Sequence, residues 1–167
     1  NNPRFDTPHG IAISPEGLVY VADRGNNRIQ IFKEDGTYVT QWVYDPETKW
    51  PGSTWDLAIP ETDPDYLVFI DGTNNKLNVV RRSDGKVVHS YGRTGHYAGE
   101  FIYGHAIAID HQGNVYTGEV AGGLRLLLGR LDRPGQQLDD QAVSAHVVDP
   151  GVTNDLLQGG GALLEVV

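Results

Sequence analysis

The chain has 167 residues, of which 39% are hydrophobic and 21% are charged. This composition suits about one folded domain and excludes a disordered tail as the whole molecule. Because there is no Cys, disulfides and thiolate metal sites are excluded, and any metal must bind His, Asp or Glu. The net charge of −9 disfavours nucleic acid as a partner, and no apolar run approaches the roughly 20 residues of a membrane-spanning helix.

A sequence repeat organises the first two thirds of the chain. Residues 8–32 recur in outline at 55–80 and again at 105–119. The acidic residue that ends the second predicted strand of each copy is Asp23, Asp71 or Glu119, which gives a period of 48 residues.

Each repeat contains short runs rich in Val, Ile and Tyr, separated by hairpin signals such as Asn-Asn and Asp-Gly. The first copy predicts strands at residues 11–13, 18–22, 28–32 and 37–42. Four strands per unit of this length are typical of a β-propeller blade. We therefore predict an all-β fold, a partial β-propeller of about three four-stranded blades. A single β-sandwich is the alternative, but it would not explain three copies in phase.

The predicted blades cover residues 1–123, divided at about 5–50, 51–100 and 101–123, with the last one partial. Since a closed propeller needs about four to eight blades, the chain is expected to be a fragment, about half of a six-bladed ring. Residues 124–167 contain no aromatic residue and lose the repeat pattern. They are predicted to be a divergent or poorly ordered tail, with a diverged final blade as the alternative.

Two histidines occupy the same repeat position. His9 and His105 each stand just before the first strand of their unit, and Trp55 holds this position in the intervening copy. Rotation about a propeller axis can bring such positions together, and neutral imidazoles suit Zn²⁺. The sequence therefore predicts His9 and His105 as metal ligands, the alternative being histidines that form hydrogen bonds at strand entries.

Three motifs carry a family resemblance. Pro-His-Gly-Ile-Ala-Ile from Pro8, Val-Tyr-Val-Ala-Asp-Arg from Val19 and Asn-Asn-Arg-Ile-Gln-Ile-Phe from Asn26 resemble the NHL repeat family. The alternation of His-bearing and His-lacking blades further resembles the peptidyl-α-hydroxyglycine α-amidating lyases, six-bladed members of that group. The similarity covers roughly residues 5–123.

This resemblance implies a zinc-dependent lyase that cleaves a C-terminal α-hydroxyglycine into a peptide amide and glyoxylate. His9 and His105 match two of the family's three zinc ligands, and the third would lie upstream of Asn1. Arg24 matches an active-site arginine, whose fork of donors suits a substrate carboxylate; pairing with Asp23 or Glu119 is its structural alternative. The resemblance is also compatible with a secreted or periplasmic location, which the sequence itself does not indicate.

Two departures from the family pattern limit the comparison. The family's catalytic tyrosine belongs to a blade absent from this sequence, so no residue takes that role, and the chain alone is expected to be inactive. The run Gly104-His105-Ala106 lacks the Pro and Asp that flank the family's last His, so a calcium site is not expected.

A second hypothesis is a non-catalytic NHL propeller that binds a protein partner at its face, because one fold hosts many functions. An RNA-binding propeller would need a basic face that the charge does not provide. A lactone-hydrolysing propeller would need a calcium centre for which no counterpart can be placed.

The remaining motifs are predicted to be architectural. Asp23, Asp71 and Glu119 each end a strand before a tight turn, so they are expected to accept backbone N–H bonds. The Asn pairs at 26–27 and 74–75 are expected to supply left-handed turn residues. Solvated or packing roles are predicted for the other histidines and for two aromatic residues near the channel: His89, His96, His111, His146, Trp55 and Tyr103.

Overall fold

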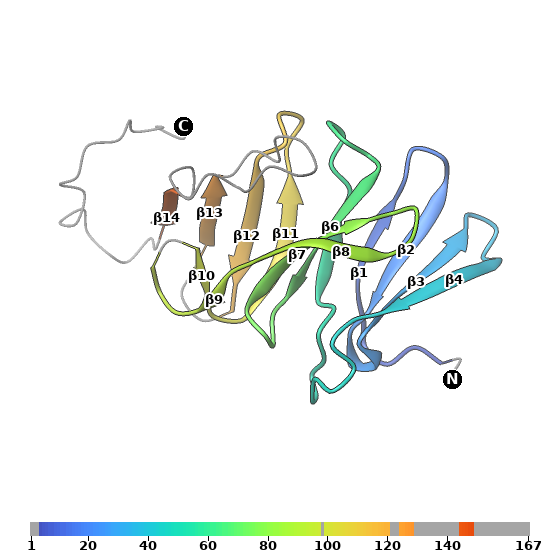
Figure 1. Ribbon diagram of the computed structural model, residues 1–167, viewed down its shortest axis with the longest axis horizontal. Helices are drawn as coiled ribbons and strands as arrows, with labels where there is room; N and C mark the ends of the chain where they lie inside the picture. Colours follow the sequence, from blue (N-terminus) through green and yellow to red (C-terminus); the bar gives the residue numbers. More distant parts are fainter. Residues whose placement is uncertain (1–3, 98, 121–123, 129–143, 149–167) are drawn as a thin grey trace.

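The computed structural model describes residues 4–97, 99–120, 124–128 and 144–148. They form three four-stranded antiparallel sheets that follow one another along the chain. Figure 1 shows the sheets side by side, with the second one between the other two. In these described ranges no helix is long and apolar enough to cross a membrane.

The sheets are simple meanders in which each strand pairs with the next. The first contains β1 (Pro8–Ile13), β2 (Leu18–Asp23), β3 (Arg28–Lys33) and β4 (Tyr38–Val43), with a 3₁₀ turn, η1 (Arg24–Asn26), after β2. The second contains β5 (Asp56–Ala58), β6 (Tyr66–Asp71), β7 (Lys76–Arg81) and β8 (Lys86–Tyr91). The third contains β11 (Gly104–Ile109), β12 (Val115–Glu119), β13 (Leu124–Leu128) and β14 (Ser144–Val148), and a short parallel pair, β9 (Arg93–Thr94) and β10 (Glu100–Phe101), precedes it.

The predicted all-β fold, a partial propeller, is confirmed. Each sequence repeat forms one four-stranded sheet, which is one blade. The innermost strands β1, β5 and β11 lie next to one another, as they do around a propeller axis. Strands β13 and β14 lie beyond residue 123 and complete the third sheet. The domain boundary at 123 stays a prediction, and the rest of the predicted tail lies outside the described residues.

The core lies in two layers, one on each side of the second sheet. Side chains alternate between the faces of a strand, so Leu67 and Phe69 of β6 pack toward the first sheet, while Val68 and Ile70 pack toward the third. All four are fully buried. A strand of the central blade that is covered on both faces therefore has a continuous apolar sequence. By contrast, Ile11 of β1 lies on the open face of the first sheet and is 66% exposed.

The strand-end carboxylates accept backbone N–H bonds, as predicted. Asp23 accepts from Asp6 N at 2.7 Å, and Asp71 accepts from Asn74 N at 3.0 Å. Glu119 accepts from the Ile102 amide at 3.1 Å. The carboxylates therefore anchor turns and do not form a ring around the axis.

The second Asn of each Asn pair joins neighbouring blades. Asn27 and Asn75 have left-handed φ values of 55° and 56°, which confirms the turn prediction. Their side chains also reach the next blade, because Asn27 Oδ1 accepts from Ser53 N at 2.7 Å and Asn75 Oδ1 accepts from Tyr103 N at 2.8 Å. Each of the first two blades thus holds the entry to the following one.

Candidate functional site

Each of the two predicted histidines occupies a β-bulge at the start of an innermost strand. In β1 the register passes from Pro8↔Asp23 to Gly10↔Ala22, which leaves His9 as the extra residue. The same shift surrounds His105 in β11. A bulge turns a side chain out of the regular alternation and is common beside active sites.

The two imidazoles meet, as the repeat predicted. The ring centroids of His9 and His105 are 4.5 Å apart, with an interplanar angle of 70°. Trp55, which stands at the equivalent position just before β5, contacts both rings edge to face, with centroids 5.9 and 5.4 Å away. Residues 96 positions apart in the chain therefore share one site, while their role as metal ligands stays a prediction.

Backbone contact fixes the tautomer of His9. Its Nδ1 lies 2.7 Å from the Trp55 carbonyl oxygen, and because a carbonyl only accepts, Nδ1 carries the proton and Nε2 keeps its lone pair. The pKa of His9 is lowered mainly by burial and further by the nearby Arg24 and His105, against the opposing effects of the Trp55 bond and Asp56. His9 is therefore neutral at pH 7, the form that binds metals.

Arg24 lies in η1 and faces the same tryptophan. Its guanidinium carbon is 4.5 Å from the Trp55 ring centroid, a cation–π distance. Asp23, one of the two partners that the structural alternative gave to Arg24 beside Glu119, pairs instead with Arg28 at 2.7 Å. Within the described part of the chain, the Arg24 Nε is buried and has no hydrogen-bond partner.

Trp55 lies at the centre of the site. The sequence predicted that it packs near the channel, but not that it contacts both histidines and Arg24. The Trp55 Nε1 donates to Gly52 O at 2.8 Å and also lies 3.2 Å from Thr73 Oγ1. A Cβ on Gly72 would lie 2.6 Å from the indole Cδ2, so a side chain at this position would displace the ring. The second repeat carries a signal for this arrangement. It has Trp55 at the position of His9 and Gly72 at the position of Arg24, so a large ring and the space for it occur together.

The described residues bring two imidazoles together without a third potential metal ligand beside them. Among them no group of three His, Asp or Glu side chains lies close enough to hold an ion. His89 stacks on Tyr91, with ring centroids 5.9 Å apart. The side chain of His146 lies outside the described residues.

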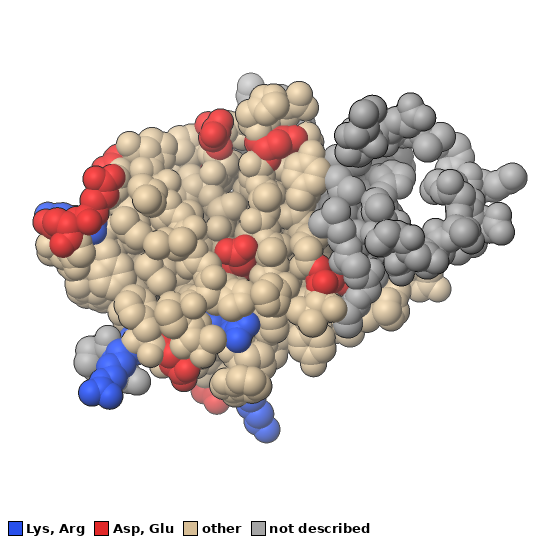
Figure 2. Space-filling model, turned by 180° about the vertical axis from the view of Figure 1, so that it is seen from behind, with Lys and Arg blue, Asp and Glu red and all other residues tan. Residues whose placement is uncertain are grey.

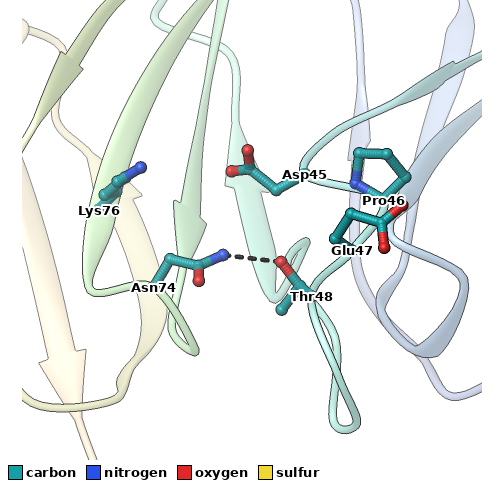
Figure 3. Close-up of a pocket in the computed structure, with 6 residues that line it drawn as sticks. All are labelled: Asp45, Pro46, Glu47, Thr48, Asn74 and Lys76. Carbon is teal, nitrogen blue, oxygen red and sulfur yellow. Dashed lines mark hydrogen bonds between the residues drawn. The ribbon is translucent and has the colours of Figure 1, made fainter.

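A separate polar cavity of about 330 Å³ lies between the loops of the first two sheets (Figure 3). Its lining residues come from the loop after β4, from the turn between β6 and β7 and from the start of β7: Asp45, Pro46, Glu47, Thr48, Asn74 and Lys76. Asn74 Nδ2 donates to Thr48 Oγ1 at 2.9 Å across it. Burial raises the pKa of Asp71 to about 6. The hydrogen bonds from Asn74 lower this pKa, and the nearby Asp45 carboxylate raises it further.

This raised pKa gives the protein a stability that depends on pH. The folded state holds the Asp71 proton up to about pH 6, whereas the unfolded chain releases it near pH 4. Stability from this group is therefore present below pH 4 and is lost as the pH rises through 6, by up to about 3 kcal/mol. Urea unfolding at pH 4 and pH 7 should show this loss in the wild type and not in Asp71→Asn. An equal pH dependence of the two proteins would contradict the assignment.

The surface charge is scattered. Figure 2 shows the face opposite to the one seen in Figure 1, where the Lys and Arg side chains of the described residues lie apart from one another, with Asp and Glu between them. On this face, the described Lys and Arg residues do not form the clustered basic stripe that is typical of a nucleic-acid-binding domain.

Comparison with known proteins identifies the repeat. Residues 5–32 match the NHL repeat. The chain is 45% identical over 78 residues to human NHL repeat-containing protein 3, a match that covers 46% of this chain and 21% of that protein. A shorter match, 55% identical over 31 residues, links 19% of this chain to 4% of the E3 ubiquitin-protein ligase TRIM71 of Gallus gallus.

The fold is shared with larger solved proteins. Virginiamycin B lyase from Staphylococcus aureus superposes with a TM-score of 0.54 at 18% identity, covering 77% of this chain and 42% of that one. At this identity the likeness concerns the fold alone. The chain therefore carries an NHL-repeat match over residues 5–32 and spans less than half the length of these relatives.

Proposed function

We propose that this chain contributes half of a zinc-dependent lyase site of the peptidyl-α-hydroxyglycine type, cleaving a C–N bond to give a peptide amide and glyoxylate. The observation that carries the proposal is the contact of His9 and His105, two bulged residues from alternate blades with ring centroids 4.5 Å apart. The hydrogen bond from His9 Nδ1 to a carbonyl supports it, because metal-binding histidines usually donate their second ring N–H in this way.

In this proposal each residue has a defined task. His9 Nε2 and the His105 ring hold the ion, together with ligands from outside the described residues. When bound, Zn²⁺ supplies Lewis acidity that eases deprotonation of the substrate α-hydroxyl. Arg24 binds the substrate carboxylate, with Trp55 holding the guanidinium in place.

The chemistry of the cleavage balances without an oxidant. The α-hydroxyl loses its proton, and its oxygen forms the C=O bond of glyoxylate. The C–N bond breaks with its electron pair going to nitrogen, which takes up a proton and becomes the amide. No described residue is assigned as the base.

Zinc titration of the metal-free protein tests the proposal. The wild type is expected to bind about one equivalent, and His9→Ala and His105→Ala should each weaken binding by at least about tenfold. His111→Ala, on a hairpin away from the site, is the matched control and should bind as the wild type does. Absence of zinc binding, or equal binding by all four proteins, would contradict the proposal.

A protein-interaction module is the second candidate. Trp50 and Tyr97 stand on loops with 78% and 79% of their surfaces exposed, and aromatic residues of this kind are enriched in protein interfaces. TRIM71, one of the matched proteins, is a ubiquitin ligase by name. Here Trp50→Ser and Tyr97→Ser should weaken binding of a protein partner, measured by surface plasmon resonance, and His9→Ala should not.

A further inference from the structure

Tyr103 is held in a backbone conformation that a bulky residue rarely adopts. Its φ is +51°, in the left-handed region. The conformation is fixed on both sides, since Tyr103 N donates to Asn75 Oδ1 and Val120 N donates to Tyr103 O at 3.1 Å. Strain of this kind persists where the surroundings impose it and is concentrated at functional sites.

The fold does not require an aromatic ring at this position. Tyr103 stands two residues before His105, and the residues two before His9 and Trp55 are Thr7 and Ser53. Thr7 has a similar φ of +56°. Small hydroxyl residues therefore satisfy the same position in the other two blades, and the ring of Tyr103 is an addition particular to the third.

This ring lies beside the candidate site and is open to solvent. Its centroid is 6.3 Å from that of Trp55, at an interplanar angle of 35°, and 48% of the residue is exposed. Val120, bonded to the Tyr103 carbonyl, is also exposed. Val120 follows the strand-end acid Glu119 as Arg24 follows Asp23, so an apolar residue stands in the third blade where the first has a cation.

We propose that Tyr103 and Val120 form an apolar subsite that selects a large, preferably aromatic, side chain of a ligand whose carboxylate binds Arg24. The ligand class is the C-terminal end of a peptide, whose next-to-last residue places its side chain in the subsite. Both Arg24 and Tyr103 contact Trp55, so the two side chains are grouped around one indole ring. The subsite extends the proposed function, because it specifies which side chain is accepted beside the reacting terminus. The contact between the carboxylate and Arg24 rests on the proposed function.

The test compares two probes, N-acetylphenylalanylglycine and N-acetylalanylglycine, by titration followed with NMR chemical shifts. The wild type should bind the phenylalanine compound about 3- to 10-fold more tightly, the value of one aromatic contact. Tyr103→Thr, the residue of the equivalent first-blade position, should abolish this preference, and Tyr103→Phe should keep it. Arg24→Gln should weaken both probes alike.

Three results would overturn the subsite: no saturable binding of either probe, no preference in the wild type, or an unchanged preference in a folded Tyr103→Thr. Circular dichroism establishes folding, and Tyr103→Phe, which keeps the ring, guards against a loss of structure. Zinc titration of the wild type decides the lyase proposal separately. A protein that prefers the aromatic probe but binds no zinc would retain the subsite and lose the lyase.

Discussion

Replacing Asp23 by Ala is expected to lower the free energy of unfolding by about 3–5 kcal/mol, the effect of removing one partner of a buried ion pair. Both side chains of the Asp23–Arg28 pair are almost completely buried, and the N–O distance is 2.7 Å. Asp23 also accepts from Asp6 N and from Asn26 Nδ2. The substitution therefore leaves a buried guanidinium and two further donors without their acceptor.

A double-mutant cycle separates the ion pair from the other contacts. Adding Arg28→Leu to Asp23→Ala removes the unpaired charge, so part of the lost stability should return. Asp84→Ala, which breaks the exposed Arg81–Asp84 pair, is the control and should leave the urea midpoint nearly unchanged. Similar effects of Asp23→Ala and Asp84→Ala would show that the buried pair has no special weight.

Phe69→Ala is expected to destabilise the protein by about 3–5 kcal/mol, because it opens a cavity between the first two sheets. The Phe69 ring is fully buried and lies 4.7 Å from the ring of Tyr44. Its cross-strand partner, Leu57, is buried as well. The surrounding side chains come from two sheets, so they cannot close the space without moving one blade against the other.

The matched control for Phe69 lies on the first sheet. Ile11 of β1 is the equivalent of Leu57 of β5. In the ladder Ile11 pairs with Val21, just as Leu57 pairs with Phe69. Because Ile11 is exposed, Ile11→Ala should change the unfolding free energy by no more than about 0.5 kcal/mol. Urea denaturation followed by circular dichroism measures both variants, and a comparable loss in the two would refute this assignment of the core.

The blades could be predicted from the sequence because their signals are local and repeated. The predicted strands at 11–13, 18–22 and 28–32 lie within β1, β2 and β3, since alternation and Asn-Asn turns need no tertiary information. The predicted strand at 37–42 overlaps β4 (Tyr38–Val43). The meeting of His9 and His105 followed from the same repeat, through the rotation that a propeller implies.

The rest of the candidate site depends on contacts that do not require a particular residue type and therefore cannot be recognised in the sequence. The acceptor for His9 Nδ1 is a main-chain carbonyl, which any residue at position 55 would offer. The preference of Asp23 for Arg28 over Arg24 depends on side-chain direction, because β3 brings Arg28 opposite Asp23 in the ladder. The amide of Tyr103 donates to Asn75 in the preceding blade, a partner 28 positions earlier in the chain.

The asparagine contacts between blades also give the array a direction. Asn27 offers its oxygen to the amide of Ser53, and Asn75 offers its oxygen to that of Tyr103, so each acceptor precedes its donor in synthesis. A blade that has emerged from the ribosome already presents the docking point for the segment that follows it. Domains made this way can gain order progressively from the amino terminus, with the histidine pair completed only when the third unit arrives.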